Sequence, residues 1–87
     1  MSSGDRDPRI AETIRCLIAA RAVGATLCPS DVARALEPHR ESAWRALMPE
    51  IRRVAAELVR TGEIVVTRGG RVVDAESPGG PIRIGRP

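Results

Sequence analysis

Apolar residues recur at helical spacing in the first quarter of the chain. Asp7 and Pro8 precede them, which suits a helix start with the aspartate as N-cap and the proline in the first turn. Gly24 follows as a stop signal. We therefore expect a helix over residues 8–22. Its buried face would carry Ile10, Ile14, Leu17 and Ile18, which are spaced i, i+4, i+7 and i+8.

The second apolar pattern is short. Pro29 opens it, and Val32 and Leu36 follow one helical turn apart. The next proline, Pro38, disfavours helical backbone at the residue before it. These signals predict a helix over residues 29–36.

The third pattern is the longest and covers residues 44–58. Pro49 interrupts it, because a proline disfavours the α conformation at the preceding residue and removes one backbone donor. We expect either a kink at this point or two abutting helices over residues 43–48 and 49–61. Ser42 stands where an N-cap would satisfy the first free amides.

β-branched residues dominate the last third of the chain. The runs at residues 63–67 and 72–74 flank a Gly-Gly pair, which is typical of a two-residue turn with positive φ. The sequence therefore predicts a hairpin here. Alternation over residues 81–84 predicts a last short strand, and residues 25–27 are long enough for a small β-bridge.

The predicted order of elements is helix, short strand, helix, turn, helix and hairpin. This order is typical of a winged helix-turn-helix, so we expect an α+β fold with three helices and a β-hairpin wing, the third helix kinked or split near Pro49. The 87 residues allow one domain. We assign it to residues 8–85, after a polar and disordered N-terminus at residues 1–7.

Several segments resemble known sequences. The spacing Leu58-x-x-x-Gly62-x-Ile64 resembles many winged-helix proteins. Four longer pieces of the chain are Cys28-Pro-Ser-Asp-Val-Ala-Arg-Ala-Leu36, Trp44-Arg-Ala-Leu-Met-Pro49, Gly69-Gly-Arg-Val-Val-Asp74 and Gly80-Pro-Ile-Arg-Ile84. Together they resemble a small bacterial family classified as a domain of unknown function, over roughly residues 8–85. The resemblance implies a winged-helix fold and a bacterial source, and it implies no activity and no site residue.

The charge is unevenly distributed. Residues 1–41 hold six arginines and six acidic residues, whereas residues 42–87 hold eight arginines and five acidic residues, which accounts for the whole net charge of +3. A winged helix would carry its DNA-facing parts in this second half. The chain has no Phe and no Tyr, which argues against single-strand binders that stack bases on aromatic rings.

Four arginines are candidates for contact with duplex DNA. Arg68 and Arg71 flank the predicted wing turn, while Arg52 and Arg53 lie near the start of the last helix. For duplex binding, all four must share one face and be free of carboxylate partners. A competing interpretation treats the wing tip as merely solvated. Another pairs the charges of the last helix among themselves, through Glu50, Arg53, Glu57 and Arg60.

Other reactive residues favour structural interpretations. Trp44 continues the apolar pattern, so we expect it in the core rather than as a binding anchor. His39 lies in a polar turn with no candidate nucleophile nearby. Cys28 precedes a helix, where the dipole would favour a thiolate, but it equally suits an N-cap position. Two cysteines and one histidine are too few for a usual structural zinc site. We expect free thiols, no metal, no cofactor and no enzyme activity.

Two function classes remain. The first is double-stranded DNA binding, as in a small transcriptional regulator. The second is a protein-protein interaction module with a winged-helix body, which should expose an apolar patch near Val59 or residues 82–84. The chain has neither a signal-peptide pattern at its start nor an apolar run long enough to span a membrane. We expect a cytoplasmic protein, without membrane partners, and a monomer.

Overall fold

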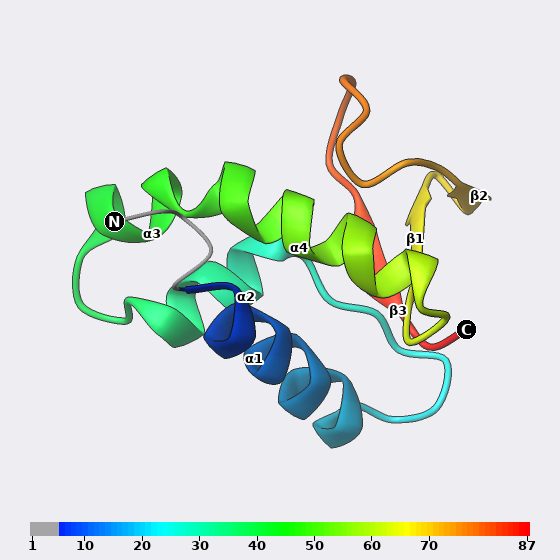
Figure 1. Ribbon diagram of the computed structural model, residues 1–87, viewed down its shortest axis with the longest axis horizontal. Helices are drawn as coiled ribbons and strands as arrows, with labels where there is room; N and C mark the ends of the chain where they lie inside the picture. Colours follow the sequence, from blue (N-terminus) through cyan, green and yellow to red (C-terminus); the bar gives the residue numbers. More distant parts are fainter. Residues whose placement is uncertain (1–5) are drawn as a thin grey trace.

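The computed structural model describes residues 6–87 and contains four helices and a three-stranded antiparallel sheet (Figure 1). The helices are α1 (Asp7–Ala20), α2 (Pro29–Leu36), α3 (Glu41–Ala46) and α4 (Met48–Arg60). The strands are β1 (Val65–Arg68), β2 (Arg71–Val72) and β3 (Arg83–Gly85). Within the described range, no helix has the length and apolar character needed to cross a membrane.

The first helix follows its apolar stripe. Ile10, Ile14 and Ile18 are its buried residues and face the core. The helix begins one residue earlier than predicted, at Asp7, so Asp7 is not the N-cap. Arg6 holds that position and makes no side-chain cap. Residues 1–5 of the segment expected to be disordered lie outside the described residues, whereas Arg6 and Asp7 belong to the folded part.

The long apolar pattern of residues 44–58 forms two abutting helices, which was one of the two structures expected near Pro49. Leu47 separates α3 from α4, and Pro49 occupies the first turn of α4, where its missing N–H costs no helical hydrogen bond. The predicted cap at Ser42 is wrong, because Ser42 lies inside α3 and the N-cap is Arg40. The second helix has the predicted bounds.

The hairpin turn is confirmed. Gly69 and Gly70 both have positive φ, +59° and +81°, and Arg68 pairs with Arg71 across them. The outer strand of this hairpin is only two residues long. The strand that completes the sheet is β3, which pairs with residues 65–67 of β1 on its other side. The strand order is therefore β2-β1-β3.

The last strand also connects the sheet to the helices. Leu27 and Ile84 form an isolated antiparallel bridge, with N···O distances of 2.9 and 2.7 Å in the two directions. Both side chains are fully buried. The expected small bridge after the first helix is therefore present, and it places the start of α2 beside β3.

The core lies between the helices and one face of the sheet. Ile51, Val54 and Leu58 of α4 pack with the stripe of α1, while Val66 and Ile82 contribute from the sheet side. In Figure 1, α1 crosses beneath α4, and the strands lie at the C-terminal end of α4. The segment between β2 and β3, hereafter the wing loop (residues 73–82), projects from this body at its middle, while Ala75 and Ile82 are buried where it leaves and rejoins the core.

Candidate nucleic-acid interface

Arg53 is committed to a contact inside the protein. Its guanidinium donates two hydrogen bonds to the Asp7 carboxylate, at 2.8 and 2.7 Å, and so connects α4 to the first residue of α1. These hydrogen bonds raise the pKa of Arg53 and lower the pKa of Asp7. A bidentate, half-buried pair of this kind holds its geometry well. Arg53 therefore does not meet the requirement of a free guanidinium.

Arg68 is also occupied, by backbone carbonyls rather than by a carboxylate. Its guanidinium donates to the carbonyl oxygens of Ser77, Pro78 and Gly80, at 3.0, 3.3 and 3.1 Å. The side chain thus lies against the wing loop and holds its far half toward β1. The arginine predicted to touch phosphates here acts within the fold.

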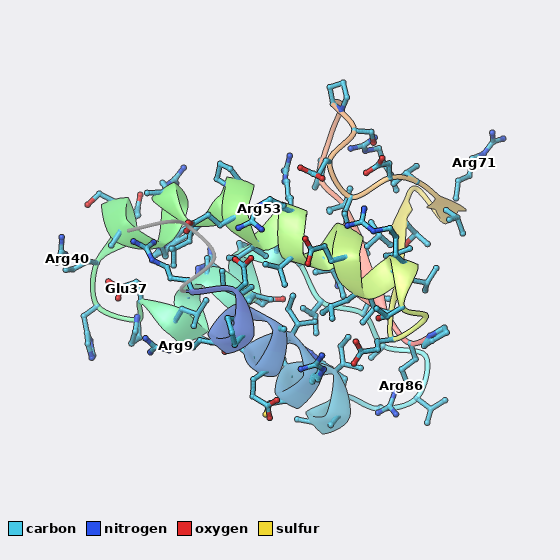
Figure 2. The ribbon with its side chains drawn as sticks, viewed as in Figure 1. Arg9, Glu37, Arg40, Arg53, Arg71 and Arg86 are labelled. Atoms are coloured by element: carbon cyan, nitrogen blue, oxygen red, sulfur yellow. The ribbon has the colours of Figure 1, made fainter. Side chains whose placement is uncertain are left out.

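Arg71 and Arg52 remain available. Of the four predicted arginines, only Arg71 is exposed, and it projects outward from the hairpin (Figure 2). Arg52 is half buried, and its Nε has no hydrogen-bond partner among the described residues. Among the described residues, neither guanidinium has a carboxylate within ion-pair distance. The Nε of Arg52 is shielded from solvent, so an external anion would meet the terminal nitrogens of that guanidinium.

Arg52 lies in a groove of about 530 Å³ between the last helix and the wing loop. Arg45 lines the same groove, together with one carboxylate, Glu76 of the wing loop. We call this the outer groove. It is formed by Arg45, Met48, Pro49, Arg52 and Glu76. Its two arginines come from α3 and α4, which the break at Leu47 joins end to end.

The Trp44 ring brings a further arginine, Arg34, close to Arg45. The guanidinium carbons of Arg34 and Arg45 lie 4.7 and 5.1 Å from the centroid of the indole ring, within cation–π range. Arg45 also pairs with Glu41 at 3.1 Å, but both side chains are largely exposed, so the pair is weak and exchangeable. The sequence prediction missed both arginines. Arg45 directly follows Trp44 in the chain, whereas Arg34 reaches the ring from another helix.

Trp44 itself is half buried rather than fully in the core. It packs against the buried cluster while the two guanidiniums stack on it. The expectation of a core residue is therefore met in part.

The predicted pairing along α4 is mostly wrong. Only Glu57 and Arg60 pair within that set, at 3.8 Å. Glu50 instead accepts a hydrogen bond from Arg6 at 3.0 Å, and Arg53 binds Asp7. We call the two contacts Arg53–Asp7 and Arg6–Glu50 the α1–α4 seam. In this seam, Glu50 of α4 pairs with Arg6 just before α1, and Asp7 of α1 pairs with Arg53 of α4.

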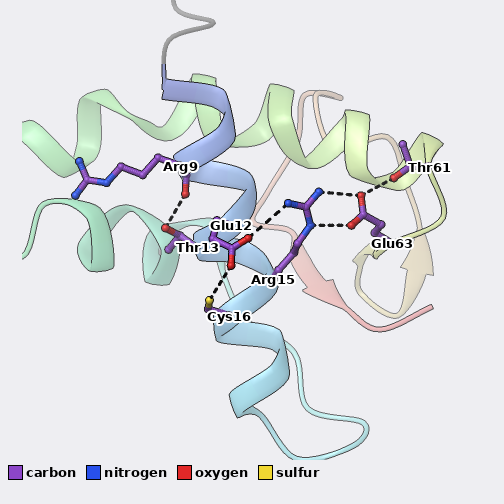
Figure 3. Close-up of polar contacts among 7 residues, drawn as sticks. All are labelled: Arg9, Glu12, Thr13, Arg15, Cys16, Thr61 and Glu63. Atoms are coloured by element: carbon purple, nitrogen blue, oxygen red, sulfur yellow. Dashed lines mark hydrogen bonds and ion pairs between the residues drawn. The ribbon is translucent and has the colours of Figure 1, made fainter.

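A second paired region lies at the middle of α1 (Figure 3). Arg15 donates to both oxygens of Glu63, at 2.7 and 3.2 Å, and Thr61 donates to the same carboxylate at 2.9 Å. The hydrogen bond from Arg15 lowers the pKa of Glu63. In the same view, the Cys16 thiol donates to Glu12, which raises the pKa of Cys16 and disfavours its thiolate.

Cys28 holds the N-cap position of α2, which is the structural interpretation of that residue. Its backbone N–H donates to the Asp31 carboxylate at 2.9 Å, and the Arg83 guanidinium contacts its sulfur. His39 is exposed in the turn before α3. Both cysteines are free thiols.

The apolar patch expected of an interaction module is not where the sequence suggested. Val59 packs partly buried against the core, and Ile82 and Ile84 are fully buried. The large apolar side chains that the described part of the chain exposes are Val23 and Val72. They come from the loop after α1 and from the hairpin, and single exposed residues of this kind are normal on protein surfaces.

The chain is thus a small α+β domain in which four helices pack on a three-stranded antiparallel sheet. It belongs to the family described as "Protein of unknown function (DUF3253)", whose model matches residues 7–87. No curated protein matches the chain.

Proposed function

We propose that this protein is a winged-helix domain that binds double-stranded DNA through the outer groove and the exposed side of the hairpin. Because Arg53 and Arg68 are held within the fold, the proposal does not rest on the full set of four arginines predicted from the sequence. The observation that supports it is that Arg45 and Arg52 line one groove beside the wing loop. The order of the elements supports the fold assignment. A helix-turn-helix arrangement of α2 with α3 and α4 is followed by a sheet whose last strand, β3, bridges back to Leu27 before α2.

The contacts would be made mainly to phosphates. Arg45 and Arg52 present donors from the split helix, and Arg71 presents one from the hairpin tip. Glu76 and Glu41 oppose them, so the net attraction is modest. We therefore expect binding to weaken steeply with salt and to depend little on sequence outside a cognate site. A small transcriptional regulator would combine such contacts with a few base contacts from α3.

The test is titration of a labelled random-sequence duplex with purified protein at several salt concentrations. The variants Arg45→Ala, Arg52→Ala and Arg71→Ala should each weaken binding and reduce the salt slope by about 1 if each removes one phosphate contact. Arg9→Ala is the matched control, because Arg9 is an exposed arginine at the opposite end of the molecule from Arg71 (Figure 2).

Two outcomes would contradict the proposal. The first is no binding at low salt by a folded sample. The second is equal weakening by Arg9→Ala and Arg52→Ala, which would indicate a diffuse charge effect without a defined face. In either case the interaction-module alternative would be tested next, by pull-down of protein partners.

A further inference from the structure

A second cleft lies away from the outer groove, where the start of α1, the end of α2 and α3 meet. Its volume is about 440 Å³, which is within the range of small-molecule sites. The apolar part of its wall comes from all three helices and from the break after α3. It consists of Ile10, Leu36, Ala43, Ala46 and Leu47.

The polar part of the wall carries an excess of positive charge. Arg9 and Arg40 line the cleft, and within residues 6–87 neither of them has a carboxylate within ion-pair distance. Arg6 lines it as well but is paired with Glu50. Glu37 is the one carboxylate of the wall. Figure 2 shows Arg9, Glu37 and Arg40 gathered at one end of the molecule.

We propose that this cleft binds a small organic carboxylate with an apolar body. A guanidinium presents a planar pair of donors that matches the two oxygens of a carboxylate, and Arg9 of α1 and Arg40 just before α3 supply such donors. Glu37 cancels part of their charge, so the site favours a single negative charge over two. The apolar body would lie against Leu36, Leu47 and their neighbours.

The site is independent of duplex binding, since it shares no residue with the outer groove. Its ligand would contact three helices at once and would stabilise the folded chain by mass action. Arg40 belongs to the turn that joins α2 to α3, so an occupied cleft also restrains that turn.

The experiment uses octanoate as the probe and contains no nucleic acid, so its result does not depend on the proposed function. Amide chemical shifts are followed by NMR during titration of the whole chain. Acetate has the charge without the apolar body, and 1-octanol has the apolar body without the charge. We expect saturable shifts at Ile10, Leu36 and Leu47 with octanoate. Acetate and 1-octanol should each bind at least about tenfold more weakly than octanoate.

The Arg9→Ala/Arg40→Ala variant should lose about tenfold or more of the octanoate affinity. Arg71→Ala is the matched control and should bind as the unmodified chain does. Both substitutions remove exposed side chains, and a circular dichroism spectrum checks that the fold is retained. Shifts centred elsewhere, equal binding of 1-octanol, or unchanged affinity of the double variant would each overturn the proposal.

Discussion

The α1–α4 seam and the outer groove use arginine in opposite ways, although they are formed by the same helix. Arg53 and Arg52 are neighbours in the sequence. Arg53 points to Asp7 and makes a bidentate pair, whereas Arg52 lines the groove and has no carboxylate within ion-pair distance among the described residues. One residue of helical rotation separates a guanidinium that holds two helices together from one that can meet a partner.

The comparison shows that the net charge of a segment does not indicate which of its arginines are free to bind a partner. The whole excess of +3 lies in the second half of the sequence. In the structure, however, two of the four predicted arginines of that half are used within the fold. Two unpaired arginines, Arg9 and Arg40, come from the neutral first half. The available charge depends on which carboxylates and carbonyls the fold brings close.

The largest expected effect tests what holds the α1 side of the molecule together. Ile14 is fully buried on the face that packs against α4. Ile14→Ala should cost about 2–5 kcal/mol of unfolding free energy, because it removes buried methyl groups and leaves a cavity. Urea denaturation measures this loss. If Ile14→Ala lowers the unfolding free energy by less than Asp7→Asn does, the charged contacts of the seam hold α1 against α4 more strongly than the apolar packing does, contrary to our expectation.

A smaller effect separates the two arginines of the hairpin. Arg68→Ala removes the donors that hold three wing-loop carbonyls and should cost about 1–2 kcal/mol. It should also speed hydrogen exchange and proteolysis in that loop. Arg71→Ala, on the other side of the same turn, should leave both unchanged while weakening duplex binding. If the two variants changed stability, loop hydrogen exchange and duplex binding equally, Arg68 could not be called structural and Arg71 available.

The smallest effect is a dependence on pH at the seam. Arg53 lowers the pKa of Asp7 in the folded protein, so this pair stabilises the fold above the ordinary aspartate pKa of about 3.9. The contribution is lost as the pH falls through the lowered value. We expect a higher Tm for the unmodified chain than for Asp7→Asn near neutral pH, and the gap should close toward pH 2.

Glu57→Gln is the control for this measurement. Its pair with Arg60 is longer, at 3.8 Å, and more exposed, so its gap at neutral pH should be smaller. A gap for Asp7→Asn that persists at the lowest pH would mean that the substitution acts through something other than the charge of the carboxylate.

Local patterns predicted the local structure well. Pro29 and Leu36 bound α2 as expected, because a proline at the start and a proline after the end leave little alternative. Pro49 divided the last helical pattern, and the Gly-Gly pair gave the turn with two positive φ values. In each case the determining groups are within a few residues of one another.

The parts that the sequence did not predict depend on contacts between distant residues. Asp7 had the residue type of an N-cap, but Arg53 lies 46 positions away and draws its carboxylate into a pair. The carbonyls that occupy Arg68 become neighbours only once β3 has returned to β1. Arg34 joins Trp44 only through the packing of α2 on α3. The periodicity of apolar residues carries no information about such contacts between distant side chains.

The bridge between Leu27 and Ile84 has a consequence for the order of folding during synthesis. Ile82 and Ile84 are synthesised after all four helices, which end at Arg60, and until they leave the ribosome a gap faces Leu27 in the core. During this interval, the apolar side chains of the helices that face the missing strand are exposed to solvent. Long-range pairing of this kind also slows folding of the finished chain. Chaperone contact during translation should concentrate on this interval, and it should end when β3 reaches its place beside β1.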